Sequence, residues 1–276
     1  MRNHAVVLTY PGHFLQTYLS LQSLHKTHPE CQRITILVDD WSDLVWPEYQ
    51  QHCTSFYGDL VTDFVFAKSY LCYARLRDQP WIRQQVFKLT LDTILPRVSQ
   101  VFWLDGDIVL YQHLPFGSTP FSVTSWSAVS QGHRQYVYDA TGLTVPNYDT
   151  ELVSGSSGTL VCLSNPPIRD IDLDHVRGVR NLIEQRHGDL INWHAKFFSI
   201  YDHAPSEWEL LACYQDQCLT QPLNLVHWPT QDLQEPVHAD SKCATSWVCD
   251  RQLDTQWWSQ QAVDWSRWWQ VLPDTK

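Results

Sequence analysis

The stretch VFWLDGDIV, residues 101–109, decides the fold and the chemistry expected of this chain. Its first four residues are apolar and predict a buried strand that ends in Asp105-Gly106-Asp107. Alternate residues of an extended chain point to the same side, so the two carboxylates face one point. The glycine between them allows close approach of a ligand, and paired carboxylate oxygens suit Mg²⁺ or Mn²⁺ that itself holds a diphosphate. The stretch therefore predicts a divalent-metal site, with a plain acidic strand end as the alternative.

The residues before this stretch alternate between strand-like and helix-like patterns. Strands are predicted at 5–9, 34–38 and 63–67, and helices at 14–25 and 79–95. Continuous apolar strands separated by helices predict an α/β fold with a mostly parallel, Rossmann-type sheet covered by helices on both faces. Ligands of such sheets bind beyond the carboxyl ends of the strands. Thr9 and Tyr10 follow the first strand, and Asp39 and Asp40 follow the second.

The helix predicted at 79–95 carries a polar stripe. Gln85, Lys88 and Asp92 fall on one side of it, whereas Ile82 and Val86 belong to an apolar face. Such a stripe is either a solvated surface or part of a binding site, and the pattern leaves both interpretations open.

The second half of the chain is less regular. Residues 115–146 show no clear helix or strand, the Gly/Ser-rich loop 154–158 precedes a strand at 159–163, and helices are predicted at 172–186 and 206–214, with a last strand at 223–226.

The start of the helix at 206–214 contains two glutamates with different expected roles. Ser206 reads as the N-cap and Glu209 as the residue that closes a capping box. Glu207 is then left free at the helix end. It is a candidate general base, with a plain helix-end charge as the alternative.

Composition excludes several classes of protein. Lys plus Arg (19) minus Asp plus Glu (30) gives a net charge of −11, which disfavours nucleic acid as a partner. No segment resembles a signal peptide or a transmembrane helix, and the eight cysteines are scattered, which favours reduced thiols. We expect a protein of the cytoplasm, bacterial or that of a virus-infected host, without membrane association.

Three stretches together resemble a known superfamily. VFWLDGDIV, preceded by Lys88-Leu89 in a helix and by Leu95-Pro96, is similar to the metal-site region of GT-A-fold glycosyltransferases of the Asp-x-Asp type. WIRQQVFKL (81–89) and SEWEL (206–210) are similar to stretches of a poorly characterised, glycosyltransferase-like family of bacterial and viral proteins. The resemblance covers approximately residues 4–230.

The resemblance implies a role for several residues. A nucleotide-sugar donor would lie over the first strands, contacted by Thr9, Tyr10 and Asp39, with Asp105 and Asp107 on the metal. Gln85 and Lys88 match the helix that precedes the metal-site strand in such enzymes, where Lys88 would neutralise donor phosphate. His227, after the last strand, occupies the place of a histidine that binds the metal or the diphosphate in many GT-A enzymes, and a structural histidine is the alternative.

The C-terminal segment matches nothing in this resemblance. Six tryptophans fall within 23 residues, namely Trp247, Trp257, Trp258, Trp265, Trp268 and Trp269. We expect a helical extension at 241–276 that packs on a domain formed by residues 1–240. Stacking on sugars or docking to a membrane interface is the alternative, and the acidic residues of the segment disfavour the membrane.

Together these patterns predict a metal-dependent glycosyltransferase. It would move a sugar from a nucleoside-diphosphate sugar to a hydroxyl of a carbohydrate or other acceptor, with Mn²⁺ or Mg²⁺ as cofactor. If Glu207 acts as the base, the configuration at the anomeric carbon is inverted, and if no base reaches the acceptor, retention remains open. The alternatives are a catalytically silent carbohydrate-binding protein and a nucleotidyltransferase, although the latter lacks a Gly-rich basic loop after the first strand.

Overall fold

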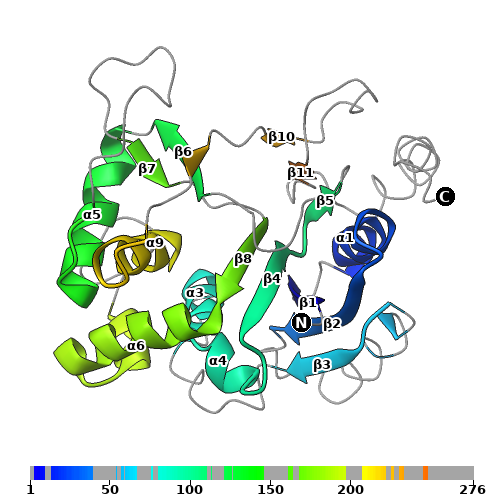
Figure 1. Ribbon diagram of the computed structural model, residues 1–276, viewed down its shortest axis with the longest axis horizontal. Coiled ribbons are helices and arrows are strands. Elements are labelled where there is room, and N and C mark those ends of the chain that lie inside the picture. Colours follow the sequence, from blue (N-terminus) through cyan, green and yellow to red (C-terminus); the bar gives the residue numbers. More distant parts are fainter. Residues whose placement is uncertain are drawn as a thin grey trace. The chain divides into compact units, whose positions relative to one another are not determined.

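The computed structural model of the chain describes residues 3–9, 14–39, 54, 57–58, 60–66, 76, 80–110, 113, 121–125, 127–145, 161–163, 168–196, 207–221, 225–226, 230–232 and 245–247. The chain has a mixed α/β fold with a mostly parallel sheet flanked by helices, as the sequence predicts (Figure 1). It divides into two compact units. The first contains Met1–Ala67, Phe102–Thr119 and Pro229–Lys276, and the second contains Lys68–Val101 and Pro120–Trp228.

The first unit contains the parallel strands that the apolar runs predict. Its elements are β1 (Asn3–Thr9), α1 (Phe14–Thr27), β2 (Cys31–Val38), β3 (Asp63–Phe66), the greater part of β4 (Gln100–Asp105), β5 (Ile108–Leu110), β10 (Thr230–Asp232) and β11 (Thr245–Trp247). The strands pair in the order β3-β2-β1-β4, all parallel. In the register, Thr9 lies opposite Val38 and Leu8 lies opposite Asp105. The carboxyl ends of β1, β2 and β4 therefore meet at one edge.

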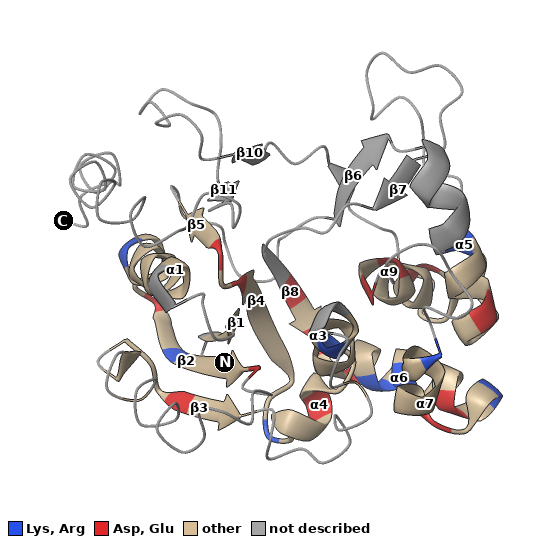
Figure 2. Cartoon of the chain, turned by 180° about the vertical axis from the view of Figure 1, so that it is seen from behind, with Lys and Arg blue, Asp and Glu red and all other residues tan. Residues whose placement is uncertain are grey.

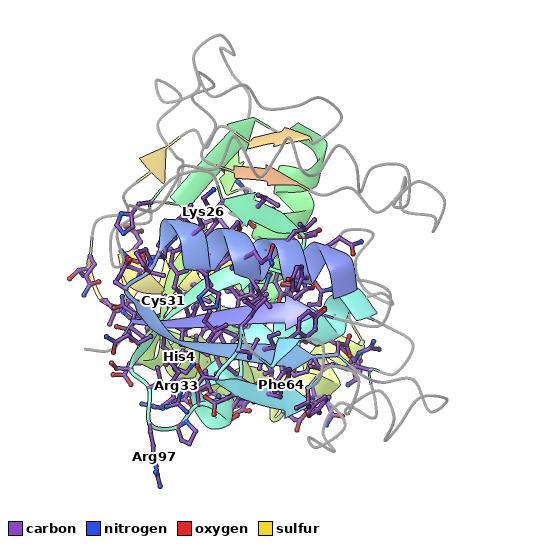
Figure 3. The ribbon with its side chains drawn as sticks, turned by 90° about the vertical axis from the view of Figure 1, so that its right-hand side faces the viewer. His4, Lys26, Cys31, Arg33, Phe64 and Arg97 are labelled. Atoms are coloured by element: carbon purple, nitrogen blue, oxygen red, sulfur yellow. The ribbon has the colours of Figure 1, made fainter. Side chains whose placement is uncertain are left out.

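The core of this unit forms where the apolar strands and α1 pack together. Val6, Ile36 and Phe102 are fully buried, and α1 lies over the strands β1 and β2 and runs along them (Figure 3). At the opposite end of the sheet from the Asp-Gly-Asp turn, His4 Nε2 and Thr35 Oγ1 lie 2.8 Å apart on neighbouring strands. Beyond β4, the chain turns into β5, which pairs antiparallel with β11, and β11 pairs parallel with β10.

The second unit is mainly helical. Its elements are α3 (Pro80–Lys88), α4 (Leu91–Ile94), β6 (Phe121–Ser125), α5 (Ser127–Thr141), β7 (Val161–Leu163), β8 (Ile168–Asp172), α6 (Leu173–His187), α7 (Leu190–Ala195), α9 (Glu207–Gln217) and β9 (Leu225–Val226). β6 pairs with β7 and β9. The end of β8 lies beside the start of β4, because Leu173 N donates to Ser99 O at 2.9 Å.

Two of the secondary-structure predictions are wrong in this unit. The helix predicted at 79–95 is interrupted at Leu89 and Thr90. Thr90 adopts φ −123° and ψ 9°, and its hydroxyl donates back to Val86 O at 2.8 Å, so the chain turns into the separate helix α4. The region 115–146, read as irregular, contains β6 and α5. Its serines and Gly132 lower helix propensity, but α5 buries Tyr136 and Val137, which compensates for it.

Most of Pro229–Lys276, the last segment of the first unit, lies outside the described residues. Within the extension expected at 241–276, only β11 is described, so the predicted tryptophan-rich helix lies outside the described residues. Among the described helices, none combines the length and apolarity needed to cross a membrane.

Candidate metal and nucleotide site

The Asp105-Gly106-Asp107 turn lies at the point of the sheet where the strand order reverses. The chain passes from β1 outward through β2 to β3 and then returns to the other side of β1 with β4. In open α/β sheets, ligands bind beyond the carboxyl ends of the strands at such a switch point. The turn is at the carboxyl end of β4, with Leu8 of β1 directly opposite Asp105. Figure 2 shows acidic residues, in red, at this end of β4.

Gly106 is a position where no other residue fits without movement. A Cβ atom on it would lie 2.2 Å from Leu8 O and 2.9 Å from Thr17 Oγ1. The carbonyl oxygen of Gly106 accepts a hydrogen bond from Ser20 Oγ at 3.0 Å. The turn is therefore packed tightly between the end of β1 and helix α1.

Helix α1 holds this turn through a row of buried hydroxyls. Thr17, Ser20 and Ser23 are each fully buried and follow one another at intervals of three residues. Thr17 Oγ1 lies 2.7 Å from Thr9 Oγ1, and Leu110 N donates to Ser23 Oγ at 3.0 Å. One helix face thus binds β1, the turn and β5. Sequence analysis missed these residues, although small hydroxyls spaced by three in an apolar helix are the signal that could have revealed them.

The Asp105 carboxylate is held from within its own strand. Trp103 Nε1 donates to Asp105 Oδ1 at 2.7 Å, and the Trp103 side chain is fully buried. Residues two apart on a strand share a face, which brings the indole under the carboxylate. Trp103 was not among the residues that the sequence indicated for the site.

The other predicted strand-end residues of the first unit converge on the same edge. Asp39 N donates to Thr9 O at 2.8 Å, which joins the ends of β1 and β2. Thr9 is fully buried and Asp39 is nearly so. Tyr10 and Asp40 lie outside the described residues, as does His227.

The two carboxylates of the turn suit a cation whose other ligands are phosphate oxygens of a bound substrate. Asp105 and Asp107 are both partly exposed at the strand end. In the described part of the chain, no cluster of three or more His, Cys, Asp or Glu residues could hold a metal by itself. Mg²⁺ is commonly bound by one or two carboxylates together with substrate phosphates, not by an all-protein cage. The carboxylates of Asp105 and Asp107 are ligands of the type that such a set requires.

Gln85, Lys88 and Glu207, which were also predicted for the site, form a buried cluster within the second unit. Lys88 Nζ and Glu207 Oε1 lie 2.6 Å apart, with the two side chains 2% and 0% exposed. The Gln85 amide, with its nitrogen turned toward the carboxylate, donates to Glu207 Oε1 at 3.0 Å. Lys88 Nζ also lies 4.8 Å from the centre of the Trp208 ring, a cation–π arrangement. The ion pair and the cation–π contact connect helix α3 to helix α9.

The expectation that Glu207 is left free at the helix end is therefore wrong. The start of α9 is packed against α3, and the carboxylate has an ammonium and an amide as partners. Lys88 likewise has its charge matched inside the protein. An isolated buried charge is costly, and this pairing is what permits both groups to be buried.

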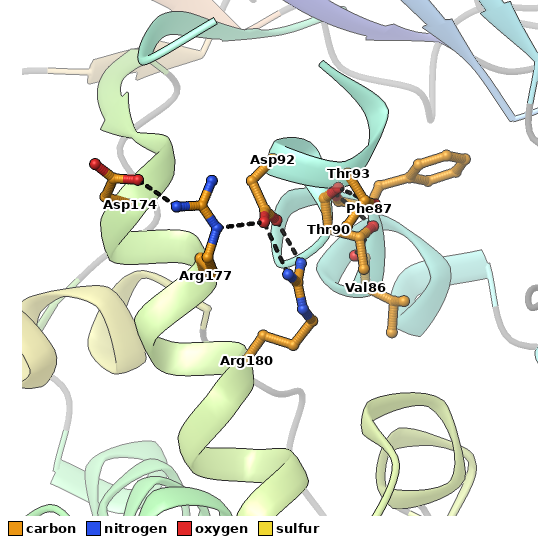
Figure 4. Close-up of polar contacts among 8 residues, drawn as sticks. All are labelled: Val86, Phe87, Thr90, Asp92, Thr93, Asp174, Arg177 and Arg180. Atoms are coloured by element: carbon orange, nitrogen blue, oxygen red, sulfur yellow. Dashed lines mark hydrogen bonds and ion pairs between the residues drawn. The ribbon is translucent and has the colours of Figure 1, made fainter. Parts of the chain in front are cut away.

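Asp92 completes a polar stripe that is buried instead of solvated. Both guanidinium nitrogens Nη1 and Nη2 of Arg180 donate to its carboxylate, Nη2 at 2.8 Å, and Arg177 Nε lies 3.3 Å from Oδ2 (Figure 4). Arg177 in turn contacts Asp174 at 2.6 Å. The stripe of Gln85, Lys88 and Asp92 thus joins α3 and α4 to α9 and α6.

Two of the three described cysteines are buried thiols. Cys31, Cys213 and Cys218 are thiols and form no disulfide. Burial raises the pKa of the Cys31 thiol to about 11 and raises the pKa of Cys213 further. These two thiols therefore stay protonated near neutral pH and do not serve as nucleophiles.

Comparison with known proteins gives a single kind of match. No protein-family model matches the chain, and no curated protein matches it. Among solved structures, the chain is similar to an active-site mutant of LgtC, with 12% sequence identity, a TM-score of 0.46, and coverage of 99% of this chain and 97% of that chain. Similarity at this level carries no information about catalytic residues or substrates.

Proposed function

We propose that this protein is a metal-dependent glycosyltransferase that moves a sugar from a nucleoside-diphosphate sugar to an acceptor hydroxyl. The observation that carries the proposal is the position of Asp105-Gly106-Asp107 at the switch point of a parallel sheet, in a turn where a Cβ on Gly106 would meet Leu8 O. The resemblance of this stretch to the metal-site region of GT-A glycosyltransferases supports it.

In this proposal, the edge formed by β1, β2 and β4 binds the donor. Thr9 and Asp39, at the neighbouring strand ends, contact the nucleoside, and Asp105 and Asp107 hold a divalent cation with the diphosphate. Tyr10 and His227 are further candidates from the resemblance. A bound cation would supply electrostatic stabilisation of the charge that develops on the departing diphosphate.

The transfer step itself makes one bond and breaks one. The acceptor oxygen forms a bond to the anomeric carbon, and the bond between that carbon and the diphosphate oxygen breaks with its electron pair going to the diphosphate. The acceptor proton is released to a base. We assign Lys88, Gln85 and Glu207 to holding the second unit together, because their side chains already bind one another in a buried cluster.

Binding of nucleotide-sugars in the presence of Mn²⁺ tests the proposal. A panel of donors is screened for thermal stabilisation of the protein, and the best donor is then titrated by calorimetry. Asp105→Asn and Asp107→Asn should each weaken donor binding at least tenfold while the melting temperature stays near that of the wild type. Asp174→Asn, which removes an equal charge on α6, is the control and should bind the donor normally.

The products distinguish the alternative functions. Release of nucleoside diphosphate that depends on donor, acceptor and Mn²⁺ supports a glycosyltransferase. Sugar binding without any release would indicate a silent carbohydrate-binding protein, and release of pyrophosphate from a nucleoside triphosphate would indicate a nucleotidyltransferase. Unchanged donor affinity in both aspartate variants would show that the metal site is assigned wrongly.

A further inference from the structure

We infer that Trp103 is a positioning residue that orients the Asp105 carboxylate for a divalent cation. The inference rests on the proposed metal site and extends it to a residue that does not itself contact ligand. Its basis is the hydrogen bond from Trp103 Nε1 to Asp105 Oδ1, 2.7 Å long, within one face of β4.

The Trp103 indole is fixed in place by its surroundings. Trp103 is fully buried in the middle of β4, opposite Val6 of β1, and its side chain is among the largest that are completely enclosed. An indole N–H is a donor only, so its partner must be an acceptor. The carboxylate oxygen of Asp105 fills that role, and the rigid ring restricts how the carboxylate can turn.

Orientation matters most where a cation has few protein ligands. The turn offers the carboxylates of Asp105 and Asp107, and the described residues contain no group of three or more His, Cys, Asp or Glu that could hold a metal. A freely turning Asp105 would lose side-chain entropy when the cation binds, and the indole removes part of that cost beforehand. Groups that hold metal ligands in place typically change metal affinity 10-fold to 100-fold when they are removed.

The first test measures metal binding by the free protein, without turnover. Trp103→Phe keeps an aromatic ring but removes the N–H donor. Titration with Mn²⁺ alone, followed by the electron paramagnetic resonance signal of free Mn²⁺, should show a dissociation constant at least about tenfold higher than that of the wild type. Trp193→Phe, which changes a tryptophan of the second unit that stacks on His187, is the matched control and should bind Mn²⁺ normally.

The second test examines the hydrogen bond in the absence of metal. The measurement is the NMR resonance of the Trp103 indole N–H. The chain has 14 tryptophans, and this resonance is identified by its loss in Trp103→Phe. Asp105→Asn should move that resonance, whereas Asp107→Asn, an identical change two residues further along, should leave it nearly unchanged. This readout separates a role in orienting Asp105 from a general effect on stability.

The outcomes are distinct for the inference and for the proposed function. A folded Trp103→Phe variant with unchanged Mn²⁺ affinity overturns the inference, and so does an indole resonance that responds equally to both asparagine variants. Absence of Mn²⁺ and donor binding in the wild type overturns the proposed function. In that case, the response of the indole to Asp105→Asn decides by itself whether Trp103 orients the carboxylate.

Discussion

Lys88 and Glu207, which are 119 residues apart in the chain, form an ion pair with an Nζ to Oε1 distance of 2.6 Å and almost no exposure to solvent. Each group is the opposite charge that allows the other to be buried, and the Gln85 amide and the Trp208 ring also contact the pair. The pair therefore links α3 to the first turn of α9 more firmly than an exposed pair would.

Removal of either partner should destabilise the protein strongly. Lys88→Met leaves the Glu207 carboxylate buried without its cation, and Glu207→Gln leaves the ammonium without its anion. Each change is expected to lower the free energy of unfolding by about 3–5 kcal/mol, measured by urea denaturation. The double variant should lose less than the sum of the two, because no unpaired charge remains.

The exposed pair Arg33–Asp63 is the matched control for this prediction. Its side chains are 46% and 39% exposed, although the Nε to Oδ2 distance is a short 2.8 Å. Arg33→Gln should cost less than about 1 kcal/mol, since solvent screens the pair. If breaking Lys88–Glu207 and breaking Arg33–Asp63 lowered the free energy of unfolding equally, burial would not determine how much an ion pair contributes.

Asp92 provides a second prediction, on the contact between α4 and α6. Asp92→Asn should cost about 3–5 kcal/mol, because it leaves two guanidinium groups around a buried amide. Arg180→Gln should cost nearly as much, since Arg180 is only 13% exposed. Arg177→Gln should cost less than about 1 kcal/mol because Arg177 is 51% exposed. Urea denaturation of the three variants measures this order, and a reversal of the two arginines would contradict it.

The strands of the first unit could be predicted from sequence because their signal is local. The runs at 5–9, 34–38 and 101–104 are apolar and short, and the Asp-Gly-Asp turn follows directly from the last of them. The ends of these strands meet as expected, because parallel strands with their carboxyl ends aligned must place Thr9, Asp39 and Asp105 at one edge.

The second unit was harder to predict because its polar contacts are long-range. Gln85, Lys88 and Asp92 look like a solvated stripe in any single helix, and only the distant Glu207 and Arg180 turn that stripe into a buried interface. Helix α5 was missed for a related reason. Its local propensity is weak, and the burial of Tyr136, Val137 and Ala140 stabilises it instead.

Gly106 gives a prediction about the tightness of the Asp-Gly-Asp turn. Gly106→Ala would place a Cβ 2.2 Å from a backbone oxygen, so the turn must shift. We expect a loss of about 1–3 kcal/mol in the free energy of unfolding, together with weaker Mn²⁺-dependent donor binding. Gly188→Ala is the control: its Cβ would meet nothing within 4 Å, but φ of +80° strains any side chain. Gly188→Ala should lower the free energy of unfolding by about 1–2 kcal/mol and leave donor binding intact. Normal donor binding by Gly106→Ala would contradict the prediction, because it would mean that the turn tolerates the added Cβ.

The last prediction concerns the pH dependence of stability through His194. His194 is completely buried, with Tyr136 Oη 2.9 Å from Nε2 and Leu190 O 2.8 Å from Nδ1. The Leu190 carbonyl can only accept, so Nδ1 carries the proton and the tyrosine hydroxyl donates to Nε2. Burial lowers the pKa of His194 to about 4 from 6.5. Between these two values the unfolded chain binds a proton at this position and the folded protein does not.

The free energy of unfolding should therefore fall as the pH drops from about 6.5 to about 4, with a contribution from His194 of about 3 kcal/mol over the window. His194→Gln should remove this contribution to the slope, measured by urea denaturation at several pH values between 4 and 7.5. Tyr136→Phe keeps the imidazole and serves as the control: it should lower stability at every pH and retain the slope. His4, whose pKa burial also lowers to about 4, stays in both variants and contributes to the slope that remains in His194→Gln. A variant without His194 that keeps the full wild-type slope would show that folding does not lower the pKa of this histidine.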